Sequence, residues 1–253
     1  MADYAHNPCQ IASGLTIQNN RIRNNLADGV NFCNGTYNST VENCNIRNGG
    51  DDGLAVWPNN FNGAPMAYND TFTHNTIEFE WRSSGIALYG GSGHQVTYNV
   101  VEDLYMSAGF RVTTGFSGYQ FQNNTGITLS NDTFITCGTG YDAWGGELGA
   151  IDLEASSSSI QNFTFSNIQV IDAQHDGYAF GFSGGIGPGM QFTTCVADGT
   201  GLDGRTTSKY TQAHLGAGIE TYGAGSATFT GFTYSNCAGG EIFNQGGFVL
   251  TFK

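Results

Sequence analysis

Three aspartates have the spacing that a carboxylate catalyst would need. Asp51-Asp52 stands directly before Gly53, and Asp28 stands directly before Gly29, at an interval that recurs elsewhere in the chain. Clustered carboxylates repel one another, so a fold seldom gathers them without a use. A carboxyl acid and a carboxylate base on either side of a glycosidic bond can hydrolyse it. We therefore predict that Asp28, Asp51 and Asp52 are catalytic, one protonating the leaving oxygen and another activating water.

The same residues have a structural explanation, because Asp-Gly is ordinary turn chemistry. For the isolated pairs Asp176-Gly177 and Asp203-Gly204 we favour that explanation. For Asp28, Asp51 and Asp52, which stand at matching positions of successive repeats, we favour catalysis. A structural calcium ion is a further option for three carboxylates. The hydrolytic interpretation needs no metal or other cofactor.

Aromatic residues accompany the three aspartates. Trp57 and Tyr89 stand at the same offset from their glycines, and Trp81-Arg82 comes shortly before the second of these. Sugar rings stack on aromatic faces through their apolar C–H surfaces. We therefore predict that Trp57, Trp81, Arg82 and Tyr89 bind substrate. For Tyr89, covering one end of the core is an equally good explanation.

A repeat along the chain must position these residues. A glycine followed by alternating apolar residues recurs, and its interval from Gly29 to Gly53 is repeated from Gly85 to Gly109. Other intervals are longer, and irregular enlargements of such a period indicate a solenoid with loops on some coils. The aligned glycines are Gly29, Gly53, Gly85, Gly109, Gly149, Gly177, Gly218 and Gly240.

A second register precedes each glycine and ends in an asparagine, a residue that tolerates the left-handed backbone of a bend. Its asparagines are Asn19, Asn43, Asn75, Asn99, Asn131, Asn167 and Asn236. After each glycine, alternate residues are apolar, as in Leu54 and Val56, which places them inside. The pattern predicts an all-β parallel β-helix of about eight coils, forming one domain over 1–253.

Enlarged intervals between coils predict loops that wall a cleft on one face. The inserted stretches are 58–70, 136–147, 152–161 and 199–214. Because stacked coils are about 4.8 Å apart, the residues preceding the glycines should be lateral neighbours. Asp28 and Asp52 should therefore stack on successive coils, with Asp51 beside them.

Composition narrows the class of partner. The formal charge of −13 excludes nucleic acid and disfavours a polyanionic substrate, so a neutral polysaccharide fits best. No apolar run reaches the length of a membrane span. We read His94 and the His175-Asp176 pair as turn or surface residues rather than catalytic groups.

Cysteine number and sequons favour a secreted protein with disulfides and glycans. The six cysteines are Cys9, Cys33, Cys44, Cys137, Cys195 and Cys237. The six Asn-x-Ser/Thr sequons begin at Asn34, Asn38, Asn69, Asn123, Asn131 and Asn162. No signal peptide is visible at the start of the chain.

Three segments together resemble glycoside hydrolase family 87, the α-1,3-glucanases (mutanases) and mycodextranases. They are Asp28-Gly29-Val30, residues 50–57 (GDDGLAVW) and residues 81–91 (WRSSGIALYGG). The resemblance implies a right-handed parallel β-helix that hydrolyses an α-1,3-glucan or mixed α-1,3/α-1,4-glucan with inversion, using aspartates. Asp70 is a candidate for a further acidic residue of that family.

Members of that family are usually larger, whereas this chain starts almost inside the helix. We therefore expect a fragment lacking N-terminal coils, whose uncapped end and unpaired strand edge favour association. The oligomeric state itself is left open.

Three other classes of β-helix protein remain open. Polygalacturonases of family 28 share the aspartate arrangement, but Gly93-His94-Gln95 departs from their Gly-His-Gly motif, and Arg-x-Lys is absent. Dextranases of family 49 share the fold. A non-catalytic carbohydrate-binding or surface-structural β-helix would use the aspartates in turns or for calcium. Convergence of the three carboxylates in one groove separates the hydrolases from that last class.

Overall fold

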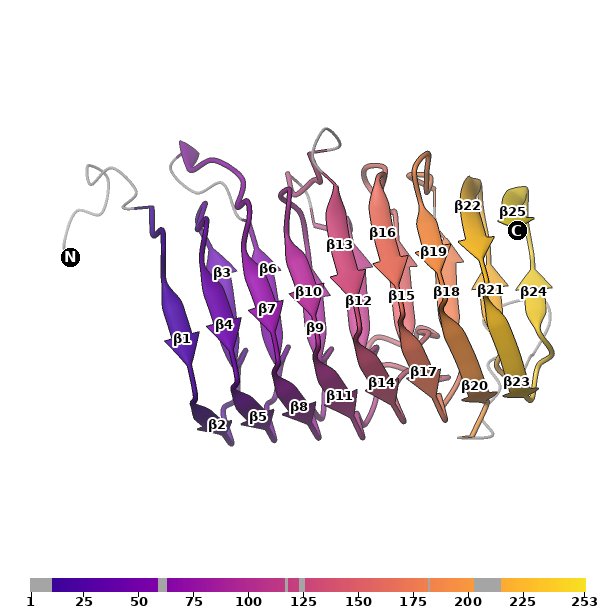
Figure 1. The fold of residues 1–253 in the computed structure, drawn as a ribbon, viewed down its shortest axis with the longest axis horizontal. Coiled ribbons are helices and arrows are strands. Elements are labelled where there is room, and N and C mark those ends of the chain that lie inside the picture. The colour runs from indigo at the N-terminus through magenta and orange to yellow at the C-terminus, as the bar shows by residue number, and fades with distance from the viewer. Residues whose placement is uncertain (1–10, 59–62, 117, 123–125, 182, 203–214) are drawn as a thin grey trace.

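The computed structural model describes residues 11–58, 63–116, 118–122, 126–181, 183–202 and 215–253. Their secondary structure consists of short β-strands, with no α-helix in these ranges. They contain no helix long and apolar enough to cross a membrane. The strands advance along the long axis of the molecule, from β1 at one end to β25 at the other (Figure 1).

Three parallel sheets run along the molecule, and consecutive strands of the chain fall in turn into each of them. Sheet I contains β1 (Thr16–Gln18), β4 (Thr40–Glu42), β7 (Thr71–Thr73), β10 (Gln95–Thr97), β13 (Ile127–Ser130), β16 (Phe163–Ser166), β19 (Gln191–Thr193), β22 (Gly225–Thr230) and β25 (Phe248–Phe252). Sheet II contains β2 (Arg21–Arg23), β5 (Asn45–Arg47), β8 (Thr76–Glu78), β11 (Val100–Glu102), β14 (Thr133–Ile135), β17 (Gln169–Ile171), β20 (Val196–Thr200) and β23 (Thr233–Cys237). Sheet III contains β3 (Val30–Cys33), β6 (Leu54–Trp57), β9 (Ile86–Leu88), β12 (Phe110–Thr113), β15 (Ile151–Glu154), β18 (Tyr178–Gly181), β21 (Ile219–Thr221) and β24 (Ile242–Asn244).

The predicted alternation after the glycines is confirmed in sheet III. Leu54 and Val56 of β6 are fully buried in the core, and so are Ile86 and Leu88 of β9. Strand pairing joins Leu54 to Ile86 and Val56 to Leu88, so equivalent side chains stack from coil to coil. Three parallel sheets around one core are the arrangement expected of a parallel β-helix. Its handedness and the number of coils stay predictions.

The glycine register is wrong at two places. Strand pairing aligns Gly109 with Ala150 rather than Gly149, and Gly218 with Glu241 rather than Gly240. The stretch before β15 contains its own antiparallel bridge between Thr139 and Leu148, which absorbs one residue. The residue that precedes the register position there is therefore Gly149.

The bends between sheets I and II contain two kinds of asparagine. Asn19, Asn43 and Asn131 adopt the left-handed backbone, with φ of 59°, 51° and 60°. Asn75 and Asn99 lie one position further on, because His74 and Tyr98 take the left-handed position in those coils. The predicted register is thus off by one there, and Asn236 lies within β23 instead.

Asn75 and Asn99 form a buried hydrogen-bonded ladder. The Asn99 side-chain amide donates to Phe72 O and to Asp132 Oδ1, at 3.0 and 2.9 Å. Its Oδ1 accepts the Asn75 backbone N–H at 3.0 Å. Replacing Asn99 by Ala removes these hydrogen bonds and leaves the buried Asn75 N–H without its acceptor, so we expect the free energy of unfolding to fall by about 2 kcal/mol. Urea denaturation at neutral pH measures this, and a loss under about 0.5 kcal/mol contradicts a supporting role for the ladder.

Four of the predicted disulfide cysteines are thiols in the structure. Cys44, Cys137, Cys195 and Cys237 each donate to backbone carbonyls of their own and the preceding coil. The disulfide expectation is therefore wrong for these four, because their positions inside successive coils satisfy each thiol locally. Cys9 and the sequon at Asn123 lie outside the described residues.

Both histidines that we read as turn or surface residues are buried. His94 Nδ1 accepts the backbone N–H of Asp70 at 3.2 Å. His175 Nε2 lies 3.6 Å from Asp176 Oδ2 and 3.8 Å from Glu147 Oε1. The surface interpretation is wrong because these imidazoles serve as interior partners where the chain bends.

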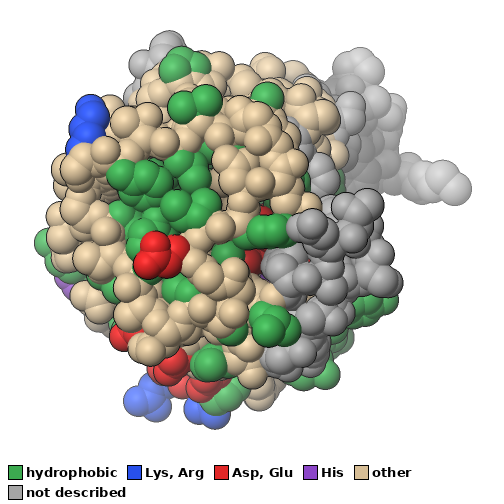
Figure 2. Space-filling model, turned by 90° about the vertical axis from the view of Figure 1, so that its right-hand side faces the viewer, with side chains coloured by type: hydrophobic (Ala, Val, Ile, Leu, Met, Phe, Trp, Pro, Cys, Tyr) green, Lys and Arg blue, Asp and Glu red, His purple; other side chains and the backbone are tan. Residues whose placement is uncertain are grey.

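The last strands expose apolar side chains at the end of the molecule. Ile242, Val249 and Phe252 are exposed, and each of β23, β24 and β25 closes its sheet in the described part of the chain. Hydrophobic side chains gather in the middle of this end face (Figure 2). The association that we predicted concerns the N-terminal end of the helix, and it stays a prediction.

Candidate active site

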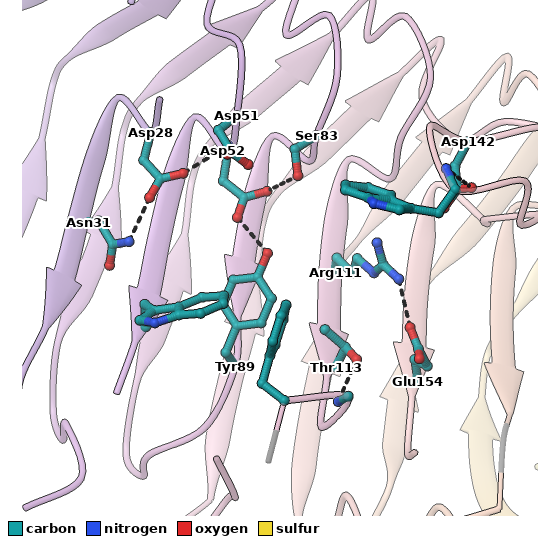
Figure 3. A pocket seen from close by; sticks show the side chains of 14 residues that line it. Asp28, Asn31, Asp51, Asp52, Ser83, Tyr89, Arg111, Thr113, Asp142 and Glu154 are labelled. Atoms are coloured by element: carbon teal, nitrogen blue, oxygen red, sulfur yellow. Dashed lines mark hydrogen bonds and ion pairs between the residues drawn. The ribbon is translucent and has the colours of Figure 1, made fainter. Parts of the chain in front are cut away.

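The outer face of sheet III carries a pocket with a volume of ≈ 540 Å³. Its floor comes from side chains that alternate with the core residues, among them Asn31, Arg111 and Glu154. The three predicted catalytic aspartates line one side of it, at the turns that lead from sheet II into sheet III (Figure 3).

The structure brings Asp28, Asp51 and Asp52 together, as their registers predict. Each offers an oxygen, and these oxygens all lie within 4.8 Å of one another. Asp28 and Asp52 belong to adjacent coils, and the Asp52 backbone N–H donates to Asp28 Oδ1 at 3.1 Å. The carboxylates therefore converge rather than serving three separate turns.

Asp52 is held firmly at the edge of the pocket, only 2% exposed. Its Oδ1 accepts the Ser83 hydroxyl at 2.6 Å and the Ser84 backbone N–H at 2.9 Å. Its Oδ2 accepts the Tyr89 hydroxyl at 2.6 Å. Burial raises the pKa of Asp52 to about 6, against the opposing effect of these donors.

Asp28 is also fixed by hydrogen bonds. Its Oδ2 accepts the Asn31 side-chain amide at 2.6 Å. Partial burial, opposed by that hydrogen bond, raises the pKa of Asp28 above its ordinary value, and the neighbouring Asp51 adds to the rise.

Behind the cluster lies Glu80, which sequence reasoning missed. Burial first, then repulsion from Asp52 and Asp28, raises the pKa of Glu80 to about 8.

Asp51 differs from its neighbours in being paired with a long, exposed side chain. Arg82 Nη2 lies 2.5 Å from Asp51 Oδ2, and both side chains are substantially exposed. Arg82 was predicted to bind substrate; the structure places it against a predicted catalytic carboxylate.

Trp57 and Tyr89 lie in the pocket, where both were predicted. Trp57 packs against Tyr89 and Phe116, with ring centroids 4.7 and 4.3 Å away. Together with Tyr119 these rings cover the small outward residues of β6 and β9. Tyr89 is buried, so its ring supports Trp57 while its hydroxyl reaches Asp52.

Three predicted residues, Trp81, Arg82 and Asp70, do not line the pocket. Trp81 lines a separate groove around the corner of the turn. Asp70 is buried in the bend before sheet I, where its Oδ1 accepts the Ser39 backbone N–H at 3.0 Å. The proposed counterpart role of Asp70 therefore has no support in the geometry, because its position faces another side of the solenoid.

The opposite side of the pocket contains residues that we did not predict. Arg111 Nη2 lies 2.6 Å from Glu154 Oε2, and Arg111 Nε lies 3.7 Å from Asp152 Oδ2. Asp142 and Trp144 come from the insertion 136–147, whose predicted wall is confirmed. Asp152 and Glu154 fall in β15 rather than in a loop, contrary to the predicted insertion 152–161. Their outward alternation in a strand was the missed signal.

The donors around the three aspartates bear on the calcium option. Three donors occupy both oxygens of Asp52, and Arg82 takes an oxygen of Asp51. A calcium ion would have to displace several of these contacts, since it needs six to eight oxygen ligands. The environment therefore suits proton transfer better than metal binding.

Together, three parallel sheets around one core and an outer pocket lined by carboxylates and aromatic rings define a parallel β-solenoid protein with a pocket on the outer face of one sheet. Comparison with known families makes the assignment specific. Residues 9–150 match the model of the alpha-1,3-glucanase catalytic domain D2. The chain belongs to this family, within glycoside hydrolase family 87, as the sequence motifs indicated.

Solved structures agree with that membership. The Agl-KA catalytic domain is 52% identical, with a TM-score of 0.95 over 99% of this chain and 44% of that one. The catalytic unit of a thermostable GH87 alpha-1,3-glucanase from Streptomyces thermodiastaticus is 23% identical, with a TM-score of 0.68 over 94% and 43%. A GH87 alpha-1,3-glucanase catalytic domain in complex with tetrasaccharides is 21% identical, with a TM-score of 0.76 over 94% and 45%.

This chain thus spans less than half the length of the structures it matches. No curated protein sequence gives a significant match.

Proposed function

We propose that this chain carries the catalytic site of a glycoside hydrolase that cleaves α-1,3-glucan. The observation that carries the proposal is the convergence of Asp28, Asp51 and Asp52 in one pocket. Family membership supports the choice of substrate, and so does the neutral, aromatic character of one pocket wall. A mixed α-1,3/α-1,4-glucan is the second candidate substrate.

Relatives add two pieces of support. One GH87 alpha-1,3-glucanase was solved with nigerose and with tetrasaccharides bound. Its structures include variants with alanine at one of three aspartates, two of them adjacent in sequence and the third earlier in the chain. The interval from that earlier aspartate to the adjacent pair is the same as the interval from Asp28 to Asp51 and Asp52 in this chain.

The hydrogen bonds suggest a division of labour. Asp28 and Asp52 are pinned by donors on adjacent coils, which suits carboxylates that hold and deprotonate a water. Asp51 is more exposed than Asp52, and its partner Arg82 is itself exposed and able to turn towards solvent, so Asp51 can reach a glycosidic oxygen. We assign Asp51 as the general acid.

Inversion is the stereochemical outcome that we propose. The distance between the carboxylates follows from the coil spacing and is nearer to that of retaining enzymes, about 5 Å, than of inverting ones. A retaining enzyme, however, needs only an acid and a nucleophile. A third converging carboxylate is explained if one water must be both positioned and deprotonated, and this favours inversion.

Tyr89 is expected to tune Asp52. Its hydroxyl donates to Asp52 and so favours the charged carboxylate. In Tyr89→Phe the pKa of Asp52 rises above about 6, so the acidic limb of the activity–pH profile moves up by about one pH unit. The profile of initial rates across the acidic and neutral range measures this. An unmoved acidic limb contradicts a role for ionised Asp52.

Three further properties belong to the proposal. We infer secretion, because the chain is rich in Asn-x-Ser/Thr sequons and in polar, uncharged residues. We infer that 1–253 forms one domain and that catalysis needs no metal. Activity that survives dialysis against a chelator supports the last point, and its loss, restored by calcium, contradicts it.

Product analysis tests the function. The purified chain is incubated with α-1,3-glucan, mixed α-1,3/α-1,4-glucan, dextran and polygalacturonate, and released oligosaccharides are separated. We expect release from α-1,3-glucan, and little or none from dextran or polygalacturonate. If the folded chain cleaves none of the polymers but adsorbs to one, the site binds glycan without cutting it.

A further inference from the structure

A second groove lies around the corner from the candidate active site. With a volume of ≈ 560 Å³, it runs across the turns between sheets II and III. We call it the Trp81 groove. Its lining includes Asn48, Phe79, Trp81, Asp103, Tyr105 and Gln174.

Three aromatic rings of the Trp81 groove face solvent. The side chains of Phe79, Trp81 and Tyr105 are 37%, 45% and 61% exposed, although large aromatic side chains are usually mostly buried. Trp81 and Tyr105 come from the turns before β9 and β12, which are adjacent in sheet III. The Tyr105 backbone N–H donates to Glu80 O at 3.1 Å, so the two residues lie on neighbouring coils, whose backbones are about 4.8 Å apart. Two rings in such a row present a stacking surface for consecutive sugars of one chain.

The local backbone is arranged around these rings. Phe79 adopts φ 56°, a left-handed position that Asn48 takes in the preceding coil and that is uncommon for a bulky residue. The Arg47 guanidinium lies over the Phe79 ring, 4.6 Å from its centroid. A Cβ at Gly50 would lie 2.5 Å from the Trp81 indole, so the glycine at this position leaves room for the ring. An aromatic residue at position 79 therefore does not serve the turn itself.

The Trp81 groove adjoins the candidate active site through one residue. The Arg82 guanidinium lies 5.9 Å from the Trp81 ring, while its Nη2 lies 2.5 Å from Asp51 Oδ2. The lining also includes the polar side chains of Asn48 and Asp103, which can hydrogen-bond sugar hydroxyls. Exposed rings beside hydrogen-bonding groups suit a neutral polyhydroxylated chain.

We propose that the Trp81 groove is a second, non-catalytic binding site for α-glucan, which holds polymeric substrate beside the catalytic pocket. The choice of α-glucan as ligand rests on the proposed function. This accounts for Trp81, whose exposed ring lies outside the pocket that its sequence position suggested.

Adsorption to insoluble α-1,3-glucan tests the proposal. The parent is Asp52→Asn, which removes turnover, and the test variant adds Trp81→Ala and Tyr105→Ala. We expect the test variant to bind about tenfold more weakly, because two stacking contacts are lost. Its thermal unfolding should stay near that of the parent, since both rings are exposed.

The matched control adds Tyr98→Ala to the same parent. Tyr98 is also exposed, but stacks on His74 at the bends between sheets I and II. Its loss should leave adsorption unchanged. Equal binding by test variant and parent overturns the groove, and so does equal weakening by the control. A wild-type chain that cleaves no glucan instead overturns the proposed function, while the adsorption comparison still decides the groove.

Discussion

Replacing Asp52 by Asn is expected to lower the rate of α-1,3-glucan hydrolysis by about 10³-fold. The amide keeps the shape of the side chain and can still pair with the hydroxyls of Ser83 and Tyr89. It cannot take a proton from water. The loss should therefore appear in kcat rather than in folding, and reducing-sugar release under substrate saturation measures it.

Asp132→Asn is the matched control for this variant. Asp132 is another buried aspartate, but it belongs to the asparagine ladder far from the pocket lining. Burial raises the pKa of Asp132 to about 7, so its neutral replacement should leave activity within a few-fold of wild type. Activity of Asp52→Asn within tenfold of wild type would contradict the assigned role.

A substrate whose leaving group needs no protonation should distinguish Asp51→Ala from Asp52→Asn. An α-glucosyl fluoride releases fluoride without needing a proton from the enzyme. We therefore expect Asp51→Ala to recover activity on the fluoride relative to glucan, and Asp52→Asn to stay inactive on both. The opposite pattern would exchange the two roles.

Glu80→Gln is expected to stabilise the protein by about 3 kcal/mol more at pH 8 than at pH 5. Burial raises the pKa of Glu80 from 4.5 to about 8, so the folded protein favours its neutral form. The stability that this contributes is complete below about pH 4.5 and is lost as the pH rises through about 8. The neutral amide removes that loss.

Urea unfolding at pH 5 and pH 8 measures the effect. Other buried carboxyls with raised pKa values, Asp132 and Asp152 among them, should leave a residual loss between these pH values in the variant. Wild type should therefore lose more stability from pH 5 to pH 8 than Glu80→Gln does. Equal losses would mean that Glu80 is charged and paired in the folded state.

Much of the fold was predictable because each coil of a solenoid repeats the same local sequence pattern. The glycines before sheet III and the apolar alternation after them fixed which residues of β6 and β9 face the core. That register also predicted that Asp28 and Asp52 lie side by side. Errors of one residue arose at Gly149 and Asn99, where an inserted bridge or a substituted bend residue shifts the count.

The rest of the site depends on contacts that no local pattern encodes. Arg111 and Glu154 belong to strands separated in sequence by a long insertion, and only pairing of β12 with β15 brings them together. Trp81 stands two residues before the Ser83 that supports Asp52, yet the turn directs its ring to another face. The position of Trp81 in the sequence therefore indicated a residue near the site, but not the face of the solenoid on which its ring lies.

Hydrolysis at the three aspartates can be observed by NMR of an α-1,3-linked tetrasaccharide incubated with the purified chain. We expect new reducing ends that appear first in the inverted, β configuration, with none formed by Asp52→Asn. The absence of new reducing ends with a folded wild-type chain would contradict hydrolysis at the three aspartates. Products appearing first in the α configuration would contradict the water-activating role of Asp28 and Asp52.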